Sequence, residues 1–514
     1  MSYDPEKAAG PSSLKKSSVD SFEKSLEDHS GTAELLSQKL GFLHKMAVFL
    51  NAETKGVDLI TDEEKTDDSI LNAATMWWSA NLVIATFSLG ALGITVFGLD
   101  FWTSVLTIIF FSLLGVLPVA FFSTFGPKLG LRQMILSKFL MGNYAMRIFA
   151  LINLVACVGW GAVNIMALAQ LLHIVNNGTL PPWAGCLIIV VLTIFVSLCG
   201  YHVIHIYEKW SWIPNAVAFI AIIARMSISK NFTFGHMVGG ANTAGSVFSF
   251  GGAVFGFATG WTTYASDYTV YQPRNANATR IFFGILVGLW VPLLFTLILG
   301  AACATGTLTD EVWAKNWEEN SVGGLVYSIL VVDSLHGFGQ FLCVLLALST
   351  VANNVPNMYS MALSSQAFWS PLARIPRVAW SLVGNFATLA ISIPAYYKFD
   401  SFMSQFMSLV SYYLAIYLSI CLSEHFIHNK GDFAAYDYEH YKDPSIYSKG
   451  IAGIFAFCCG VAGVVVGMAQ EWYVGVLGRK IGEHGGDIGF ELAFAFAFIG
   501  YNLVRPFEKK YTGR

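Results

Sequence analysis

The sequence predicts an all-α integral membrane protein with twelve transmembrane helices, arranged as two inverted five-helix repeats followed by two further helices. Of its 514 residues, 55% are hydrophobic and only 12% are charged, whereas a soluble domain has about 25% charged residues. Long apolar runs follow one another from residue 74 onward, and each approaches the roughly 20 residues that a helix needs to cross a bilayer. No segment alternates in polarity as a membrane β-strand does, so the spans are expected to be helices.

The first 72 residues differ in composition from the rest of the chain. They hold 8 of the 30 Lys and Arg and 14 of the 33 Asp and Glu, mixed with Ser, Gly and Pro. This composition is typical of a disordered segment, and it lacks the early apolar core and small-residue cleavage site of a signal peptide. We expect a disordered cytoplasmic tail that stays attached, with a short helix over 33–50 lying on the membrane surface.

Twelve apolar spans follow this tail. They cover 75–98, 103–123, 147–174, 183–201, 210–227, 246–267, 281–305, 337–366, 377–394, 401–422, 451–470 and 488–505. The first ten lie within 73–422 and form the predicted core, with the two repeats over about 75–227 and 246–422. A cytoplasmic loop over 423–450 precedes the last two spans, which lie within 451–505, and residues 506–514 form a cytoplasmic C-terminal tail.

The Lys and Arg content of the loops predicts the orientation. With the N-terminus in the cytoplasm, the inner loops carry Lys128, Arg132, Lys138, Arg147, Lys209, Arg274, Arg280, Arg374, Arg377, Lys430, Lys442 and Lys449. The outer loops then carry Arg225, Lys230, Lys315, Lys398, Arg479 and Lys480. Twelve basic residues against six place both termini in the cytoplasm. The acidic segment from Asp310 to Glu319 is then expected to be an outer loop.

Several classes of function are excluded by what the sequence lacks. The net charge of −3 is small and of the wrong sign for a protein that binds nucleic acid through a basic surface. The G-x-x-x-x-G-K-[ST], H-E-x-x-H and G-x-S-x-G motifs are all missing. The eight Cys show no C-x-x-C spacing. We therefore expect no metal site, no cofactor and no catalytic centre.

Glycine residues interrupt the first and the sixth span. The first contains Phe87-Ser-Leu-Gly90-Ala-Leu-Gly93, and the sixth contains Phe250-Gly-Gly-Ala-Val-Phe-Gly256-Phe-Ala-Thr-Gly260-Trp261. Two interrupted spans five apart indicate inverted repeats, in which broken helices free backbone groups near the midplane for a substrate and a coupling ion. Close helix packing through small residues is the alternative for any single Gly.

The third and eighth spans, again five apart, carry the polar side chains. Trp160 and Asn164 are four residues apart, which puts an indole and an amide on one face of a helix. The eighth span holds Asn353, Asn354 and Asn357 around Pro356, which cannot donate to the helix ladder and so predicts a kink. Buried amides are costly in lipid unless they face partners, a cavity or a ligand. We interpret this cluster as a ligand site, with structural hydrogen bonding as the alternative.

These residues resemble one known family. The Trp160-x-x-x-Asn164 pair, Gly260-Trp261 and the segment Ala352-Asn-Asn-Val-Pro-Asn-Met-Tyr-Ser360 are similar to the nucleobase-cation symporters, in particular the fungal purine–cytosine permease branch. The likeness extends from about Asn72 to Tyr501. It implies a twelve-helix fold of the leucine-transporter type and plasma-membrane uptake of adenine, guanine, hypoxanthine and cytosine, generally driven by protons.

The resemblance also implies which residues contact the substrate. Trp160 and Trp261 match two aromatic plates that sandwich the heterocycle, and stacking on such a ring is worth roughly 1–3 kcal/mol per base. Asn164 and Asn354 match positions whose amides meet the edge of the base, with Asn353 as the alternative to Asn354. An amide complements the exocyclic amine and ring nitrogen of cytosine and adenine. The expected substrate-binding residues are Ser88, Trp160, Asn164, Gly260, Trp261, Asn353, Asn354, Pro356 and Asn357.

Four residues are candidates for the break and for coupling. Ser88 matches a family position near the ligand and is expected at the break in the first span. Ser349 and Thr350 look like the hydroxyl pair that sodium-coupled relatives use with first-helix carbonyls, but their shorter spacing to the Asn pair argues against sodium. Glu208, at the cytoplasmic start of the fifth span, is the candidate for proton-linked gating, because partial burial favours proton uptake by a carboxylate. An interfacial ion pair with Lys209 is the alternative.

The sequence thus predicts a proton-coupled symporter of purine bases and cytosine that works by alternating access in the plasma membrane. Its expected partners are these bases and the lipid bilayer. A symporter of an allantoin-, hydantoin-, uracil- or thiamine-type substrate is the first alternative, and a channel or sensor for small heterocycles is the second. An integral membrane enzyme is disfavoured because no nucleophile, base and orienting group recur together on facing spans.

Overall fold

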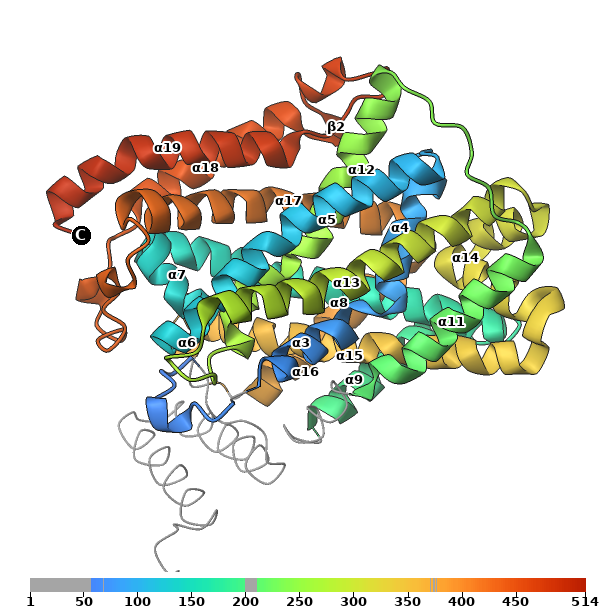
Figure 1. The fold of residues 1–514 in the computed structure, drawn as a ribbon, viewed down its shortest axis with the longest axis horizontal. Helices are drawn as coiled ribbons and strands as arrows, with labels where there is room; N and C mark the ends of the chain where they lie inside the picture. Colours follow the sequence, from blue (N-terminus) through green and yellow to red (C-terminus); the bar gives the residue numbers. More distant parts are fainter. Residues whose placement is uncertain (1–56, 68, 199–209, 370, 373–374, 376) are drawn as a thin grey trace, which may run out of the picture.

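The structure, a computed structural model, describes residues 57–67, 69–198, 210–369, 371–372, 375 and 377–514. Within these residues the chain is a bundle of long helices, most of them aligned with the long axis of the molecule (Figure 1). The sheet found there is a hairpin of β1 (Ala469–Gln470) and β2 (Tyr473–Val474), which pair antiparallel with Ala469 opposite Val474. The prediction of an all-α protein is confirmed.

Helices overlap all twelve predicted spans. The first span is α3 (Ile70–Asn81) and α4 (Ile84–Thr95), and the sixth is α12 (Ala241–Thr259) followed by the 3-10 helix η2 (Gly260–Tyr268). The other ten are α5 (Phe101–Ser123), α8 (Asn143–Val175), α9 (Pro182–Leu198), α11 (Trp212–Ser229), α13 (Ala278–Ala304), α15 (His336–Phe368), α16 (Arg377–Ala395), α17 (Phe399–Leu422), α18 (Ile451–Gly467) and α19 (Gly489–Thr512). By length and composition alone, six helical segments of the described residues can cross a membrane, or seven when α3 and α4 count as one bent span. The count of twelve crossings therefore stays a prediction.

Further helices connect the spans. The α-helices among them are α6 (Phe125–Leu129), α7 (Gln133–Met141) and α14 (Glu311–Leu330). The 3-10 turns are η1 (Asp62–Glu64), η3 (Thr305–Leu308), η6 (Tyr396–Lys398), η8 (Phe433–Ala435), η9 (Pro444–Ile446) and η10 (Gly478–Lys480), and the π-helical turns are η4 (Val331–Leu335) and η7 (Ser423–His428).

The segment from Asp310 to Glu319 is a helix and not the loop that we expected. It forms the first half of α14, where Asp310 is the N-cap and its carboxylate accepts hydrogen bonds from the backbone N–H groups of Val312 and Trp313 at 2.9 and 3.1 Å. Such a cap stabilises a helix start. A search for long apolar runs misses this helix, because four of the first nine residues of α14 are charged.

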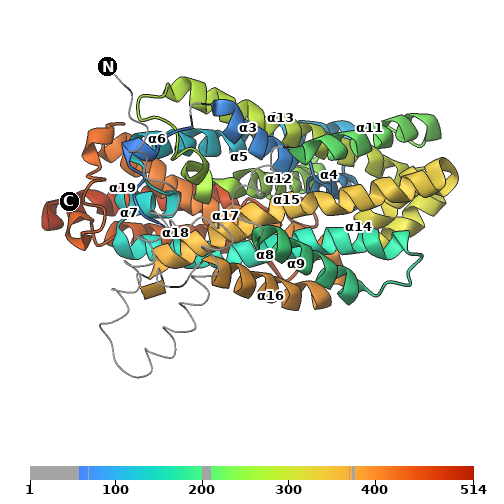
Figure 2. The ribbon, with the colours of Figure 1, turned by 90° about the horizontal axis from the view of Figure 1, so that it is seen from below.

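The two halves of the core correspond element by element. Each half begins with a broken helix, and the third long helix of each, α8 or α15, has 33 residues. These two helices pack along each other, while α4 packs on α13 and α12 packs on α5. In Figure 2, α3, α5 and α13 lie on one side of the bundle and α8, α9 and α16 on the other, with α15 and α17 between them. This correspondence is what two inverted repeats require.

The break in the first span lies before its glycines. α3 ends at Asn81 and α4 begins at Ile84, with a bend of 52°. Gly90 lies inside α4, and a Cβ atom there would come within 1.9 Å of the Leu297 carbonyl oxygen on α13. Gly90 therefore permits close helix packing. In the sixth span, by contrast, the helix changes type at Gly260, as expected.

The predicted kink at Pro356 does not interrupt the eighth span. α15 runs as one helix from His336 to Phe368 with Pro356 inside it. A proline costs a helix one backbone hydrogen bond, but α15 packs against α8 over many residues. We attribute the continuity of α15 to this packing.

Residues 57–67, which we call the strap, cross one end of the bundle before α3 begins (Figure 1). Ile60 is fully buried, and its N–H donates to the Gly130 carbonyl at 2.9 Å. Lys65 Nζ donates to the Pro127 carbonyl at 2.7 Å. The prediction of a disordered tail is therefore wrong for the strap, and the part of the tail before it lies outside the described residues.

Candidate functional site

The break between α3 and α4 frees backbone groups that side chains of other helices satisfy. The carbonyl of Leu82, inside the break, accepts a hydrogen bond from Asn215 Nδ2 of α11 at 3.1 Å. The N–H of Ile84, at the start of α4, donates to Ser349 Oγ of α15 at 3.4 Å. Because buried backbone groups in a membrane protein must be paired, α11 and α15 hold the shape of the break.

Asn353 connects this break to the third span. Its Nδ2 donates to the carbonyl of Ala80 at 2.6 Å, and its Oδ1 accepts from Asn164 Nδ2 at 2.8 Å. Both amides are buried. Since the donor and the acceptor of Asn353 are both engaged within the protein, this side chain orients Asn164 and ties α8 to the end of α3.

The other two asparagines of α15 each keep a free oxygen among the described residues. Asn354 Nδ2 donates to Thr193 Oγ1 of α9 at 3.4 Å, and Asn357 Nδ2 donates to the Cys157 carbonyl of α8 at 2.6 Å. Both amides are buried, and neither Oδ1 atom has a hydrogen-bond partner among the described residues. A buried acceptor without a donor costs roughly 1–3 kcal/mol. These two oxygens are therefore available to donors on a ligand.

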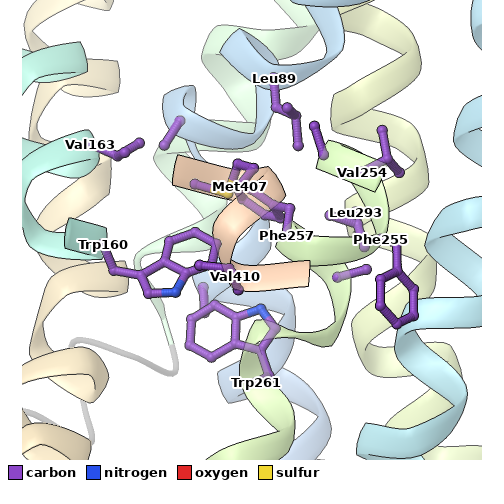
Figure 3. Close-up of a cluster of buried hydrophobic side chains, with 14 of the residues drawn as sticks. Leu89, Trp160, Val163, Val254, Phe255, Phe257, Trp261, Leu293, Met407 and Val410 are labelled. Atoms are coloured by element: carbon purple, nitrogen blue, oxygen red, sulfur yellow. The ribbon is translucent and has the colours of Figure 1, made fainter. Parts of the chain in front are cut away.

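The indole rings of Trp160 and Trp261 lie next to each other. Their centroids are 6.4 Å apart and their planes differ by 25°, and Figure 3 shows them beside Met407 and Val410. Both side chains are buried, with 6% and 3% of their surface exposed. A Cβ atom on Gly260 would come within 2.7 Å of Trp160 Cζ2. Glycine at 260 is therefore what lets the two rings approach each other.

Further aromatic rings surround this pair. Trp77 of α3 contacts Trp261 edge to face at 5.0 Å, and Phe257 and Phe406 contact Trp160 in the same way at 5.1 and 5.8 Å. Trp261 Nε1 is buried and has no acceptor within the part of the chain that the structure describes. The walls around the indole pair are thus apolar and aromatic, and the indole N–H groups of Trp261 and Trp77 are both left unpaired among the described residues.

Ser88 does not lie at the break, which corrects the sequence-based expectation. It lies within α4 beyond the break at Leu82, and it is fully buried. Its Oγ, like that of Thr86, has no partner among the described residues. The expectation followed from placing the break at the glycines. Ser88 still contributes an unpaired hydroxyl to the same core.

Ser349 and Thr350 are placed differently with respect to the break. Ser349 lies against the start of α4, and its hydroxyl donates to the Leu346 carbonyl at 2.5 Å. The Thr350 hydroxyl donates to the Ala347 carbonyl at 3.4 Å. Both hydroxyls are thus held by their own helix, and the coupling ion, with sodium disfavoured by the sequence, stays a prediction. Glu208, the candidate for proton coupling, lies outside the described residues.

Sequence reasoning missed several residues that build this site. Asn215 and Thr193 are polar residues flanked by apolar ones in their spans, and Trp77 lies before the interrupted part of the first span. A lone buried amide such as Asn215 carries a signal, because it needs a partner in lipid. Its partner, the carbonyl of Leu82, follows only from the position of the helix break.

The fold and the site together define a class of protein. A multi-pass helical membrane bundle in which two broken helices meet at a buried cluster of aromatic and amide side chains is the arrangement of a secondary transporter.

Comparison with known proteins identifies the family. A family model described as permease for cytosine/purines, uracil, thiamine, allantoin matches residues 60–476. The purine-cytosine permease FCY2 of Saccharomyces cerevisiae is 58% identical over 479 residues, which cover 93% of this chain and 90% of FCY2. The purine-cytosine permease fcyB of Emericella nidulans is 44% identical over 473 residues, which cover 92% of each chain. The chain belongs to this permease family, and it is a transporter and not an enzyme.

A solved structure supports the fold. The nucleobase-cation-symport-1 family transporter Mhp1, in a closed conformation with bromovinylhydantoin bound, superposes with a TM-score of 0.67 at 13% identity, over 90% of this chain and 95% of Mhp1. The helical fold predicted from the resemblance to the nucleobase-cation symporters is therefore confirmed.

Proposed function

We propose that this chain is a plasma-membrane symporter that takes up adenine, guanine, hypoxanthine and cytosine by alternating access, with both termini in the cytoplasm. The observation that carries the proposal is the pair formed by Trp160 and Trp261, whose ring centroids lie 6.4 Å apart. Successive bases of a strand lie about 3.4 Å apart, so a base held between two rings needs their planes about 7 Å apart. The centroid distance includes any lateral offset of the two rings, so the pair would open to admit one flat heterocycle, whether purine or pyrimidine.

The polar atoms near this pair support a nucleobase as the substrate. Asn354 and Asn357 each have a buried acceptor oxygen without a donor, and Trp261 has a buried N–H without an acceptor, among the described residues. Cytosine and adenine each carry an exocyclic amine, which is a donor, next to a ring nitrogen, which is an acceptor. The base would pair with these atoms and remove the cost of leaving them unsatisfied.

Uptake in cells that lack other carriers tests this proposal. We expect labelled cytosine and adenine to accumulate above the external concentration, which a channel cannot achieve for an uncharged solute. Unlabelled purines should compete, whereas allantoin, hydantoin, uracil and thiamine should not. Competition by one of these four alone would assign the chain to that substrate, and equilibration without accumulation would indicate a channel.

We further propose that protons drive uptake through Glu208. The support is its sequence position at the predicted cytoplasmic start of the fifth span, where a carboxylate partly removed from water gains affinity for a proton. Glu208→Gln should lower accumulation more than it lowers binding, and it should flatten the dependence of uptake on external pH. A protonophore should abolish accumulation by the wild type. Loss of uptake on replacing sodium, with an unchanged pH profile for Glu208→Gln, would instead favour sodium at Ser349 and Thr350.

A further inference from the structure

A cavity lies away from the proposed substrate site, on the outside of the bundle. It is a groove of about 820 Å³ between α3, α11 and α13. Its walls include Leu71, Phe283 and Val287, whose side chains are 67%, 56% and 54% exposed. Apolar side chains that are exposed on a membrane-spanning bundle face the hydrocarbon of the bilayer. The groove therefore opens toward lipid and not toward the substrate pathway.

Glycines make the groove concave on the α13 side. A Cβ atom on Gly284 would come within 2.5 Å of Ile70, and one on Gly288 within 2.8 Å of Ala74. This spacing of two small residues four apart lets α3 lie close to α13. The hollow that remains beside them has the apolar lining that an acyl chain requires.

Two tryptophans and one arginine lie at the same groove. Trp78 of α3 and Trp212 of α11 contact each other edge to face at 6.4 Å, and both line the groove. Tryptophan is enriched at the level of the lipid headgroups. Arg280, in the first turn of α13, also lines the groove, and its side chain is exposed. Within the described ranges its guanidinium group forms no ion pair.

We propose that this groove binds an anionic glycerophospholipid, with the phosphate at Arg280 and an acyl chain along Gly284, Val287 and Gly288. Charge complementarity selects the ligand, since a guanidinium group without a protein partner binds a phosphate well. The helices α3, α11 and α13 all begin near the groove. In the proposed orientation this is the cytoplasmic side, where anionic lipids are concentrated. The inference rests on that orientation and not on the proposed substrate.

The bound lipid would contact α3, a helix that takes part in transport. α3 is one half of the broken helix, and it carries Trp77 and Ala80, which contact Trp261 and Asn353. A lipid seated against α3 stabilises the position of this half-helix observed here. The bound lipid is thus a structural ligand of the element that must move during alternating access.

Crosslinking in vesicles tests the proposal. The purified full chain is reconstituted in phosphatidylcholine vesicles that contain a photoactivatable phosphatidylserine, and the crosslinked peptides are identified by mass spectrometry. We expect crosslinks in α3 and α13. Arg280→Gln should reduce them about five-fold, which corresponds to about 1 kcal/mol for one basic residue near an anionic headgroup. Arg280→Lys should retain most of them, and Lys510→Gln, an exposed basic residue on α19, serves as the matched control.

Two further arms make the result decisive. Photoactivatable phosphatidylcholine should crosslink the groove no better in the wild type than in Arg280→Gln, and Val287→Trp, which fills the groove, should reduce crosslinking by both lipids. Equal phosphatidylserine crosslinking in the wild type and Arg280→Gln would overturn the proposal. So would the absence of crosslinks in α3 and α13, which would show that phosphatidylserine does not occupy the groove. Because base uptake is not the readout, a failed lipid experiment leaves the proposed function standing.

Discussion

At the scale of single residues, the hydrogen bond between Asn164 and Asn353 makes two amides act as one unit. Asn353 also holds the Ala80 carbonyl at the end of α3. We therefore expect Asn353→Ala to weaken base binding about as strongly as Asn164→Ala, by about 5-fold to 100-fold for each, since an unpaired buried polar group costs roughly 1–3 kcal/mol. The double variant should lose less than the sum, because both substitutions break the same bond.

The measurement is the uptake affinity for cytosine and adenine in the wild type, the two single variants and the double variant. Surface abundance in the same cells excludes misfolding. Asn354→Ala and Asn357→Ala remove the free oxygens directly. We expect them to change the preference among cytosine, adenine and hypoxanthine, because the edges of these bases differ in donor and acceptor order. Strictly additive losses in the Asn164 and Asn353 cycle would show that the two amides act separately.

The indole pair gives a second prediction at this scale. Gly260→Ala should weaken the binding of all bases together, because the added Cβ would come within 2.7 Å of Trp160 Cζ2 and displace the ring. Gly252→Ala, in α12 of the same span, is the matched control, since its nearest neighbour would be Phe490 at 3.7 Å, an ordinary contact. Trp160→Ala and Trp261→Ala should also weaken all bases together, and the Phe variants should keep part of the affinity. If the Gly260→Ala variant reaches the plasma membrane and binds bases with wild-type affinity, Trp160 and Trp261 do not stack on the base.

At the scale of elements, the strap joins parts of the bundle that are far apart in the sequence. Asp62 forms ion pairs with Arg274 at 3.1 Å and with Lys65 at 3.0 Å, and Asp58 pairs with Lys442 at 3.0 Å. Arg274 follows η2 and Lys442 lies in the loop before α18. Since the strap leads directly into α3, it restrains the half-helix that contacts the proposed site.

Removing one charge should loosen the strap measurably. In Asp62→Asn we expect the N–H of Ile60, which donates to Gly130, to exchange with solvent faster by no more than about five-fold, because the Asp62 side chain is 58% exposed and exposed pairs contribute little. Lys315→Gln, which breaks the exposed pair with Glu319 at the α14 end of the bundle, is the control and should leave Ile60 unchanged. Hydrogen exchange with mass spectrometry provides the measurement.

The same pair predicts how the strap responds to pH. The hydrogen bond from Lys65, opposed by partial burial and assisted by Arg274, holds the pKa of Asp62 below its usual value. A carboxylate with a depressed pKa stabilises the folded state above its unfolded pKa, and this contribution is lost as the pH falls through the folded pKa. Protection of Ile60 in the wild type should therefore be constant across neutral pH and should fall only in strong acid. A decline near neutral pH would assign the strap to another titrating group.

Which parts of the fold the sequence could predict depends on how local the physical signal is. Apolar length locates helices such as α5 and α13 to within a few residues, because crossing a bilayer requires that length. The same criterion overlooks α14, whose charged residues and N-cap Asp310 mark a helix without a long apolar run. The strap is overlooked for a related reason, since its contacts with Gly130 and Pro127 are tertiary and leave no periodicity in its own sequence.

In the site, too, the features with a local sequence signal were predicted and those that depend on tertiary contacts were not. The spacing of Trp160 and Asn164 fixes them on one face of one helix, and Gly260 is where the sixth span changes helix type. The break in the first span lies at Leu82, which no Gly or Pro marks, and so Ser88 was placed at the break incorrectly. The distinction between Asn353 and Asn354 also needed the fold, because it depends on Ala80 and Thr193 as their partners.

At the scale of the whole molecule, a small number of side-chain contacts link the two broken helices to the rest of the bundle. Asn353 and Ser349 hold the first broken helix to α15, and Trp261 carries the second into contact with Trp160 on α8. Alternating access requires the broken helices to move relative to α8 and α15. A substrate that pairs with Asn354 and Asn357 on α15 and stacks on both indoles would therefore contact both moving parts at once, which gives binding a direct effect on their relative position.

The positions of the strap and of the end of α19 give the last prediction. Leu59 in the strap donates to Tyr441 Oη at 3.2 Å, and Lys509 near the end of α19 donates to Asn429 Oδ1 at 3.1 Å. Both partners lie in the predicted loop over 423–450, so the strap and the end of α19 share one end of the bundle, which an even number of crossings requires (Figure 1). The excess of Lys and Arg in the inner loops assigns this end to the cytoplasm.

A protease added to intact cells should therefore spare epitopes placed at Ser2 and Arg514, and permeabilised cells should lose both. Cleavage of both in intact cells would reverse the orientation, and cleavage of one alone would contradict the even count.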